Sequence, residues 1–166
     1  MPKLSQDILR SNMDMAKQAK ESMASWVKEL GLWRLFVTLT MAPPSQSTGL
    51  GVTGSYDRRG YGAIRRAWGR FLELAETEVG APVSYFFVIE EHESGVPHIH
   101  ALVGPKRDGS ADFDSRELSE LARRLQNEAT RDIGFSRVKP LDPDKGAEQY
   151  VCKYCVKGDT LWEYRE

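Results

Sequence analysis

The sequence is organised around residues 90–103, which read Glu-Glu-His-Glu-Ser-Gly-Val-Pro-His-Ile-His-Ala-Leu-Val. The second half of this stretch alternates in the manner of a half-buried strand. Because successive side chains of a strand point to opposite faces, the imidazoles of His98 and His100 project from one face and Ile99 from the other. Two nitrogen ligands are therefore aimed at one point.

A second strand precedes this one. Residues 84–89, Ser-Tyr-Phe-Phe-Val-Ile, are rich in strand-forming types, and residues 93–95 supply a turn. Such a hairpin brings Glu90 beside His98, and two imidazoles with a carboxylate form a candidate site for Mg²⁺ or Mn²⁺. The alternative is that these are ordinary histidines at a sheet edge beside a solvated Glu90. All three histidines of the chain fall in this hairpin, which favours a site.

Length and composition describe a soluble globular protein. The 166 residues suit one domain, for which we expect an N-terminal helix in 1–31, a core in 32–141, and a last helix with a tail in 142–166. The net charge of −1 argues against affinity that depends on non-specific attraction to phosphates. Residues 1–20 contain no signal core and no run approaches a membrane span, which predicts an intracellular protein with no membrane partner.

The order of the expected elements predicts an α+β fold. It is a ferredoxin-like, RRM-like βαββαβ antiparallel sheet with two helices on one face, an added N-terminal helix and a C-terminal helix. We expect the other face of the sheet to be free to carry a site. The expected helices are Ser5–Leu30, Tyr61–Val79 and Asp114–Asp132, the outer strands are Leu32–Met41 and Gly134–Leu141, a long loop covers Ser45–Gly60, and Asp142-Pro143 opens the last helix.

The last helix forms the second half of the candidate site. At about 100° per residue, Tyr150, Lys153, Tyr154 and Lys157 share one arc, whereas Val151, Cys152, Cys155 and Val156 fill the opposite side. We expect the helix to bury the small apolar residues and to present two phenols and two ammonium groups. The cysteines are interpreted as core residues, because a structural zinc site normally needs four ligands and no second pair exists.

A tyrosine can act as a covalent nucleophile when cations meet its developing charge. Its ordinary pKa is about 10, so at neutral pH it needs the help of nearby lysines and a metal ion. A divalent ion on a phosphate with a tyrosine in line behind it makes a phosphodiester transesterase.

Three motifs, residues 36–40, residues 90–100 and Tyr154-x-x-Lys157, resemble in order and spacing those of the rolling-circle replication initiators, the HUH endonucleases. The run 90–102 and the tail 154–163 look particularly like the initiators of geminiviruses and related single-stranded DNA replicons. The doubled Tyr150-x-x-Lys153-Tyr154-x-x-Lys157 is similar to two-tyrosine phage initiators.

The resemblance implies a function. Such proteins use Mg²⁺ or Mn²⁺ to nick and rejoin single-stranded DNA at a plasmid or viral origin, linear or in a hairpin, through a 5′-phosphotyrosine. It implies metal ligands Glu90, His98 and His100, the nucleophile Tyr154 and its cationic partner Lys157. Tyr150 is either a second nucleophile or a neighbour of the site, and Lys153 a phosphate contact. Candidate DNA contacts are Arg58, Arg59, Arg65 and Arg66. A separate helicase is the expected protein partner, and the compartment is the bacterial cytoplasm or wherever a host copies the replicon.

Two alternatives remain at the level of sequence. One is a transposase of single-stranded insertion elements, which uses the same metal and tyrosine chemistry. The other is a non-catalytic RNA- or DNA-binding module on the same fold, which should expose aromatic residues on its central strands. Phe86 and Phe87 adjoin each other and so cannot both face such a surface.

Overall fold

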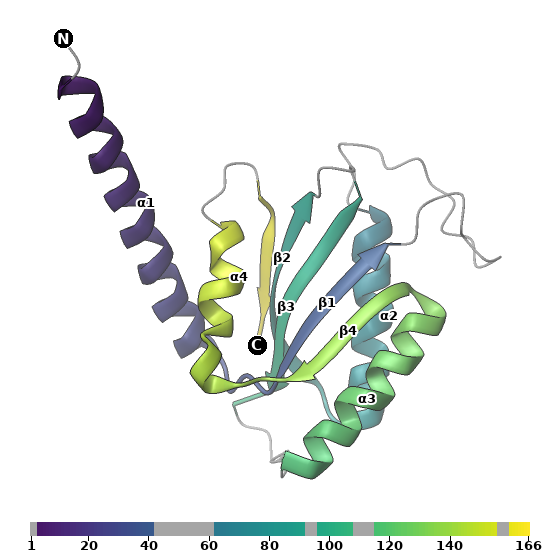
Figure 1. The fold of residues 1–166 in the computed structure, drawn as a ribbon. Coiled ribbons are helices and arrows are strands. Elements are labelled where there is room, and N and C mark those ends of the chain that lie inside the picture. Colours follow the sequence, from purple (N-terminus) through teal and green to yellow (C-terminus); the bar gives the residue numbers. More distant parts are fainter. Residues whose placement is uncertain (1–2, 42–61, 92–95, 108–114, 156–159) are drawn as a thin grey trace.

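The computed structural model describes residues 3–41, 62–91, 96–107, 115–155 and 160–166 (Figure 1). The elements in chain order are α1 (Lys3–Leu30), β1 (Leu35–Met41), α2 (Gly62–Val79), β2 (Val83–Glu91), β3 (Pro97–Pro105), α3 (Ser115–Asp132), β4 (Gly134–Pro140), the short 3-10 helix η2 (Pro143–Lys145), α4 (Ala147–Cys155) and β5 (Trp162–Arg165). The predicted loop at 45–60 and turn at 93–95 lie outside the described residues. None of the described helices is both long enough and apolar enough to cross a membrane.

The strands form one antiparallel sheet in the order β4-β1-β3-β2-β5. The first four strands with α2 and α3 form the predicted ferredoxin-like βαββαβ unit, so the predicted fold class is confirmed. The last residues were expected to form a tail, whereas Trp162–Arg165 form a fifth strand beside β2.

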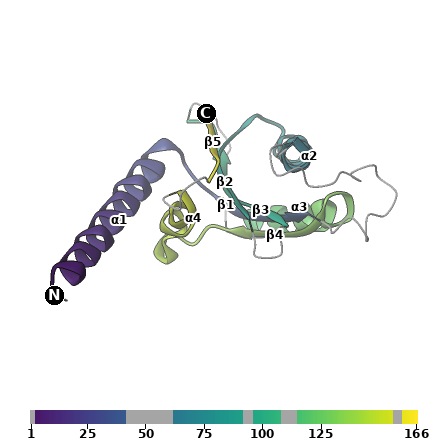
Figure 2. The ribbon, with the colours of Figure 1, turned by 90° about the horizontal axis from the view of Figure 1, so that it is seen from above.

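One face of the sheet packs against α2 and α3. Alternate residues of the strands, among them Val37, Phe87 and Ile99, share a core with Phe71 of α2 and Leu125 of α3. Seen from above, α2 lies on the side of the sheet opposite α1 and α4 (Figure 2). Apolar residues that recur at helical spacing, in 64–75 of α2 and 118–129 of α3, face this core.

The second face is only partly free, because α1 and α4 cover part of it. Phe86, Val88 and Leu102 pack there with Val27 of α1 and Val151 of α4. The reason lies in β2, where the consecutive apolar residues 86–89 present side chains to both faces and require cover on each. Phe86 and Phe87 point to opposite faces, as the alternation predicts.

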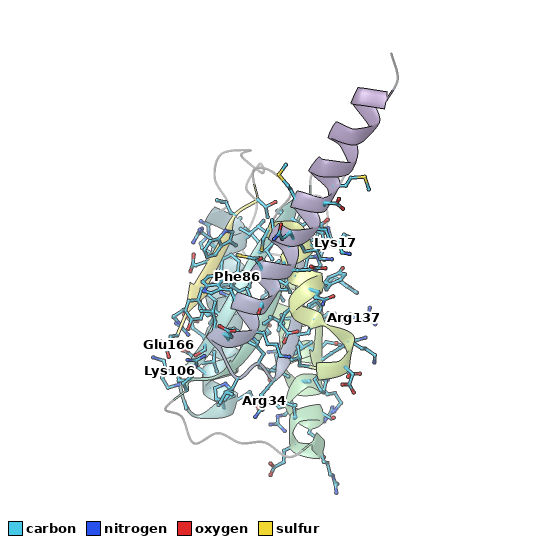
Figure 3. The ribbon with its side chains drawn as sticks, turned by 90° about the vertical axis from the view of Figure 1, so that its left-hand side faces the viewer. Lys17, Arg34, Phe86, Lys106, Arg137 and Glu166 are labelled. Carbon is cyan, nitrogen blue, oxygen red and sulfur yellow. The ribbon has the colours of Figure 1, made fainter. Side chains whose placement is uncertain are left out.

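Helix α1 contacts the rest of the fold through its C-terminal part. Val27 is buried, and its carbonyl oxygen accepts a hydrogen bond from the indole N–H of Trp33 at 2.8 Å. Farther toward the N-terminus, Met13 and Met15 are exposed. Figure 3 shows the first turns of α1 extending beyond the other elements. From Met13 onward, where the side chains of α1 are described, the buried residues lie near its C-terminal end, at Ala24 and Val27.

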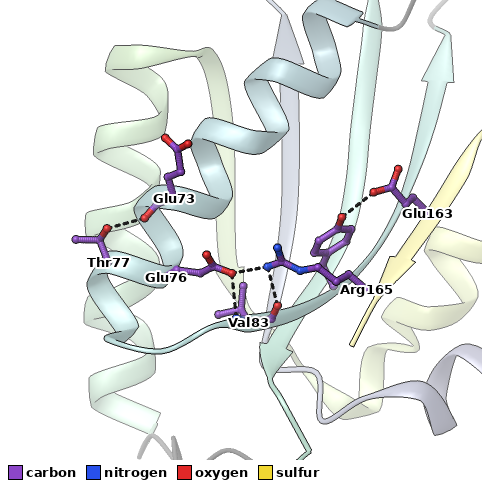
Figure 4. Close-up of polar contacts among 7 residues, drawn as sticks. Glu73, Glu76, Thr77, Val83, Glu163 and Arg165 are labelled. Atoms are coloured by element: carbon purple, nitrogen blue, oxygen red, sulfur yellow. Dashed lines mark hydrogen bonds and ion pairs between the residues drawn. The ribbon is translucent and has the colours of Figure 1, made fainter.

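Polar contacts fix β5 at the edge of the sheet (Figure 4). The guanidinium of Arg165 donates to the carboxylate of Glu76 on α2 and, at 3.0 Å, to the carbonyl oxygen of Val83. The hydroxyl of Tyr85 donates to Glu163 at 2.7 Å. Burial, together with this hydrogen bond, raises the pKa of Tyr85 to about 12. The short strand is therefore held by side chains as well as by its backbone.

Candidate functional site

The two histidines lie in the middle of the sheet, on the face that α4 partly covers. In β3, His98 pairs with Thr40 of β1 on one side and with Glu90 of β2 on the other. His100 likewise pairs with Thr38 and with Val88. Residues directly opposite each other in antiparallel strands project to the same face. The predicted hairpin therefore brings His98, His100 and Glu90 onto one surface.

Two threonines of β1 contact the imidazole rings. The hydroxyl of Thr40 lies 2.8 Å from Nδ1 of His98, and that of Thr38 lies 3.3 Å from Nδ1 of His100. A hydroxyl can accept a hydrogen bond from Nδ1–H or donate one to an unprotonated Nδ1. When the hydroxyls accept, the Nε2 atom of each ring keeps the lone pair that a metal ion requires.

Glu90 completes the polar part of the site. Its Oε2 lies 3.1 Å from Nε2 of His100. Burial lowers the pKa of His100 below its usual value, although the hydrogen bond and the charge of Glu90 oppose this shift. The neutral imidazole, which is the form that binds metal ions, is thereby favoured.

The donor atoms are of the types that bind a divalent ion. Imidazole nitrogens with a carboxylate oxygen form a mixed donor set, suitable for an ion such as Mn²⁺. Glu90 and His100 are in direct contact, and His98 lies opposite Glu90 in the strand pairing. Within the described residues, however, no three His, Cys, Asp or Glu side chains gather as a metal-binding group.

Helix α4 begins later than the sequence predicts. Asp142 accepts a hydrogen bond from the backbone N–H of Asp144 at 3.1 Å, so the predicted cap and proline start η2 and not the long helix. Gly146 then adopts a left-handed conformation, with φ at 58°, and α4 starts at Ala147. This change of direction lays α4 across β2 and β3.

Tyr154 lies directly over the histidine site. Its ring stacks on that of His100, with centroids 5.0 Å apart and planes 10° apart. Tyr154 is only 5% exposed, so this member of the predicted arc is buried against the sheet. Burial first, then the hydrogen bond to Tyr150 and the charge of Glu90, raise the pKa of Tyr154. The phenol is therefore held neutral in this structure.

Tyr150 and Lys153 border the same site and are more exposed. The hydroxyl of Tyr154 donates to that of Tyr150 at 3.1 Å, and the Tyr150 ring meets His100 edge-on at 5.5 Å. Tyr150 also contacts Phe36 of β1, with ring centroids 5.6 Å apart. The Lys153 ammonium lies 5.2 Å from the centre of the Tyr154 ring. The structure thus brings both tyrosines and one predicted lysine to the histidine site.

The structure does not bring the remaining described residues of the prediction to the histidine site. Arg58, Arg59 and Lys157 fall outside the described residues. Arg65 and Arg66 are on α2, which covers the opposite face of the sheet, and Arg65 forms an ion pair with Glu163. Arg66 is exposed on the same helix. Neither described arginine lies on the face that carries the histidines.

Thr38 and Thr40 belong to the first of the three motifs, but their contacts with the histidines are not among the predictions made from the sequence. A signal for them was present, because Thr38 and Thr40 alternate with apolar residues at the period of a strand. That period places both hydroxyls on one face, but only the register with β3 shows that they meet the histidines.

Comparison with known proteins gives one family. Residues 34–159 match the family model of the replication-associated protein ORF2/G2P. No curated protein and no solved structure matches the chain significantly. The matched range runs from the residue before β1 to beyond the end of α4 and includes every described residue of the histidine and tyrosine site.

Proposed function

The chain belongs to the replication-associated protein ORF2/G2P family, and from this premise we propose that it nicks and rejoins single-stranded DNA at a replication origin. In this proposal Tyr154 is the nucleophile and a 5′-phosphotyrosine is the intermediate. Glu90, His98 and His100 are the proposed ligands of Mg²⁺ or Mn²⁺. The proposed enzyme is an HUH endonuclease of rolling-circle replication.

The observation that carries the proposal is the stack of Tyr154 on His100. A phenol that lies against one imidazole, close to Glu90, is near the proposed metal donors. A buried tyrosine with a purely structural role would need neither a carboxylate nor a pair of histidines beside it. The association of these groups on one face supports phosphodiester chemistry.

Each group of the site has its own role in the proposed reaction. A divalent ion bound by the donors would polarise the phosphodiester and balance its charge. The Tyr154 oxygen attacks phosphorus, its bond to phosphorus forms, and the bond from phosphorus to the 3′-oxygen breaks. The products are a 5′-phosphotyrosine and a free 3′-hydroxyl, which takes up the proton that the phenol loses. Lys157 is the proposed cationic partner of the phenol, and Lys153, whose ammonium lies 5.2 Å from the centre of the Tyr154 ring, is the proposed phosphate contact.

The test is a search for the covalent adduct. The protein is incubated with pooled single-stranded oligonucleotides and Mn²⁺, with or without EDTA, and a denaturing gel reveals any protein–DNA band. We expect a metal-dependent band that Tyr154→Phe abolishes. The phenylalanine ring keeps the stacking contact with His100, so the variant should fold and still bind DNA. A band of full strength in Tyr154→Phe would refute the assignment.

A further inference from the structure

Strand β4 carries an exposed aromatic and cationic row on the histidine face. Phe135, Arg137 and Lys139 are exposed, whereas the intervening Ser136 and Val138 are buried against the other face. Phe135 has 64% of its surface accessible. The strict alternation means that all three exposed side chains point to the same side of the sheet.

This row is continuous with the site. Arg137 pairs with Thr38, which in turn pairs with His100. One step along the strand, Phe135 pairs with Thr40, whose other neighbour is His98. Phe135 and Arg137 are therefore separated from the two histidines only by the threonines of β1, and Lys139 lies opposite Phe36.

Helices leave this half of the face open. On the histidine side α4 packs on β2 and β3, and α1 packs on α4. Phe36, Thr38 and Thr40 of β1 are only half-buried, in contrast to the fully buried Val37 and Leu39 on the opposite face. Figure 1 looks onto this face, with α2 behind the sheet and β1 and β4 in plain view.

The two cations are available for an external partner. Within the described part of the chain, neither Arg137 nor Lys139 forms a hydrogen bond or an ion pair. The ammonium of Lys153 and the half-exposed Tyr150 border the open area from α4, where Tyr150 contacts Phe36. Unpaired cations with an exposed ring and phenol suit a ligand that has both phosphates and flat bases.

We propose that β4 binds the single-stranded DNA substrate, with Arg137 and Lys139 contacting phosphates and Phe135 stacking on a base. Base stacking on aromatic side chains and backbone contacts to cations are the two components of binding to single strands. The proposal rests on the proposed function, because it describes how DNA approaches Tyr154. It also assigns DNA contacts on the face opposite to Arg65 and Arg66.

Charged residues on an edge strand also protect against edge-to-edge aggregation. That role accounts for Arg137 and Lys139 but gives no reason for an exposed phenylalanine on the same strand and the same face. A strand that served only to prevent aggregation would bind no DNA, so a binding measurement separates the two roles.

The experiment measures binding of a fluorescent 20-nucleotide oligo(dT) by anisotropy, in EDTA and across a salt series, so that no cleavage occurs. The double variant Arg137→Gln/Lys139→Gln should bind more weakly, and its slope of log K against log salt should fall by about 1.4 in magnitude, roughly 0.7 for each lost phosphate contact. Phe135→Thr, which keeps a strand-forming residue, should weaken binding about 5- to 150-fold without changing this slope.

A matched control removes two charges from α3, on the other side of the sheet. Arg116→Gln/Arg123→Gln should bind the oligonucleotide as the wild type does. The proposal is overturned if the wild type does not bind the oligonucleotide, or if the β4 double variant binds it with unchanged affinity and salt slope. It is also overturned if the α3 control loses as much affinity as the β4 double variant. If the covalent adduct forms but the β4 variants bind DNA normally, the proposed function stands and this binding surface is refuted. If the β4 variants lose affinity but no adduct forms, the binding surface stands and the proposed function is refuted.

Discussion

The replacement of Thr40 by valine tests the link between β1 and the histidines. Valine has the same shape and is at least as good a strand former, so the half-buried position should tolerate it with little change in stability. What is lost is the hydrogen bond between the hydroxyl and Nδ1 of His98, at 2.8 Å. His98 would then be free to adopt the other tautomer or another ring orientation.

The size of the effect follows from that contact. Loss of one hydrogen bond of about 1 kcal/mol corresponds to an approximately 5-fold loss of Mn²⁺ affinity. Removal of a group that orients a metal-binding histidine typically costs about 10- to 100-fold. We therefore expect Thr40→Val to weaken Mn²⁺ binding by about 5- to 100-fold. Thr38→Val should cause a loss of Mn²⁺ affinity at the lower end of this range, because the Thr38 hydroxyl lies farther from its histidine, at 3.3 Å from Nδ1 of His100.

Two measurements check this prediction. Electron paramagnetic resonance of free Mn²⁺ gives the affinity, and imidazole ¹⁵N shifts of the metal-free protein report the tautomers. Thr40→Ser, which keeps the hydroxyl, should restore both. Thr77→Val is the matched control, since its hydroxyl bonds a helix carbonyl on α2 at 2.7 Å, away from the site. Wild-type affinity and unchanged tautomers in Thr40→Val would refute the reasoning.

The remaining predictions concern the close packing of β3 and the second tyrosine. A Cβ at Gly104 would collide with the backbone carbonyl of Leu32, so Gly104→Ala should lower the free energy of unfolding by about 3 kcal/mol or more in urea titrations. Gly69→Ala, in a helix with open space at its Cβ, should instead stabilise by up to about 1 kcal/mol, and an equal effect of both would contradict the packing argument. Tyr150→Phe keeps the ring contacts and loses only a hydroxyl, so the covalent adduct should persist and map by mass spectrometry to Tyr154. Loss of the adduct in this variant would identify Tyr150 as the nucleophile.

The parts of the site that the sequence predicts correctly depend on local periodicity. The alternation around Ile99 predicts that His98 and His100 share a face, and the same rule separates Phe86 from Phe87. The register of a hairpin follows from its turn and from this alternation. The pairing of Glu90 with His98 could therefore also be predicted from the sequence.

The parts that the sequence misses depend on long-range packing. A helical arc groups Tyr150 with Tyr154, but burial of Tyr154 arises because its ring meets His100, more than 50 residues earlier in the chain. Arg65 belongs to a visible cluster of positive charge, yet nothing local indicates which face of the sheet α2 covers. Strand β5 has only four residues, which are too few to show the alternation of apolar and polar residues that is typical of a strand. It forms a strand because it pairs with β2.

The course of the chain around α4 has a mechanical consequence. The preceding strand, β4, lies at one edge of the sheet and the following strand, β5, at the opposite edge, so the segment with the tyrosines spans the full width of the sheet. Tension on a DNA strand attached to Tyr154 would be passed in both chain directions, to β4 paired with β1 and to β5 paired with β2. The load would thus be shared by two sets of interstrand hydrogen bonds, one at each edge of the sheet.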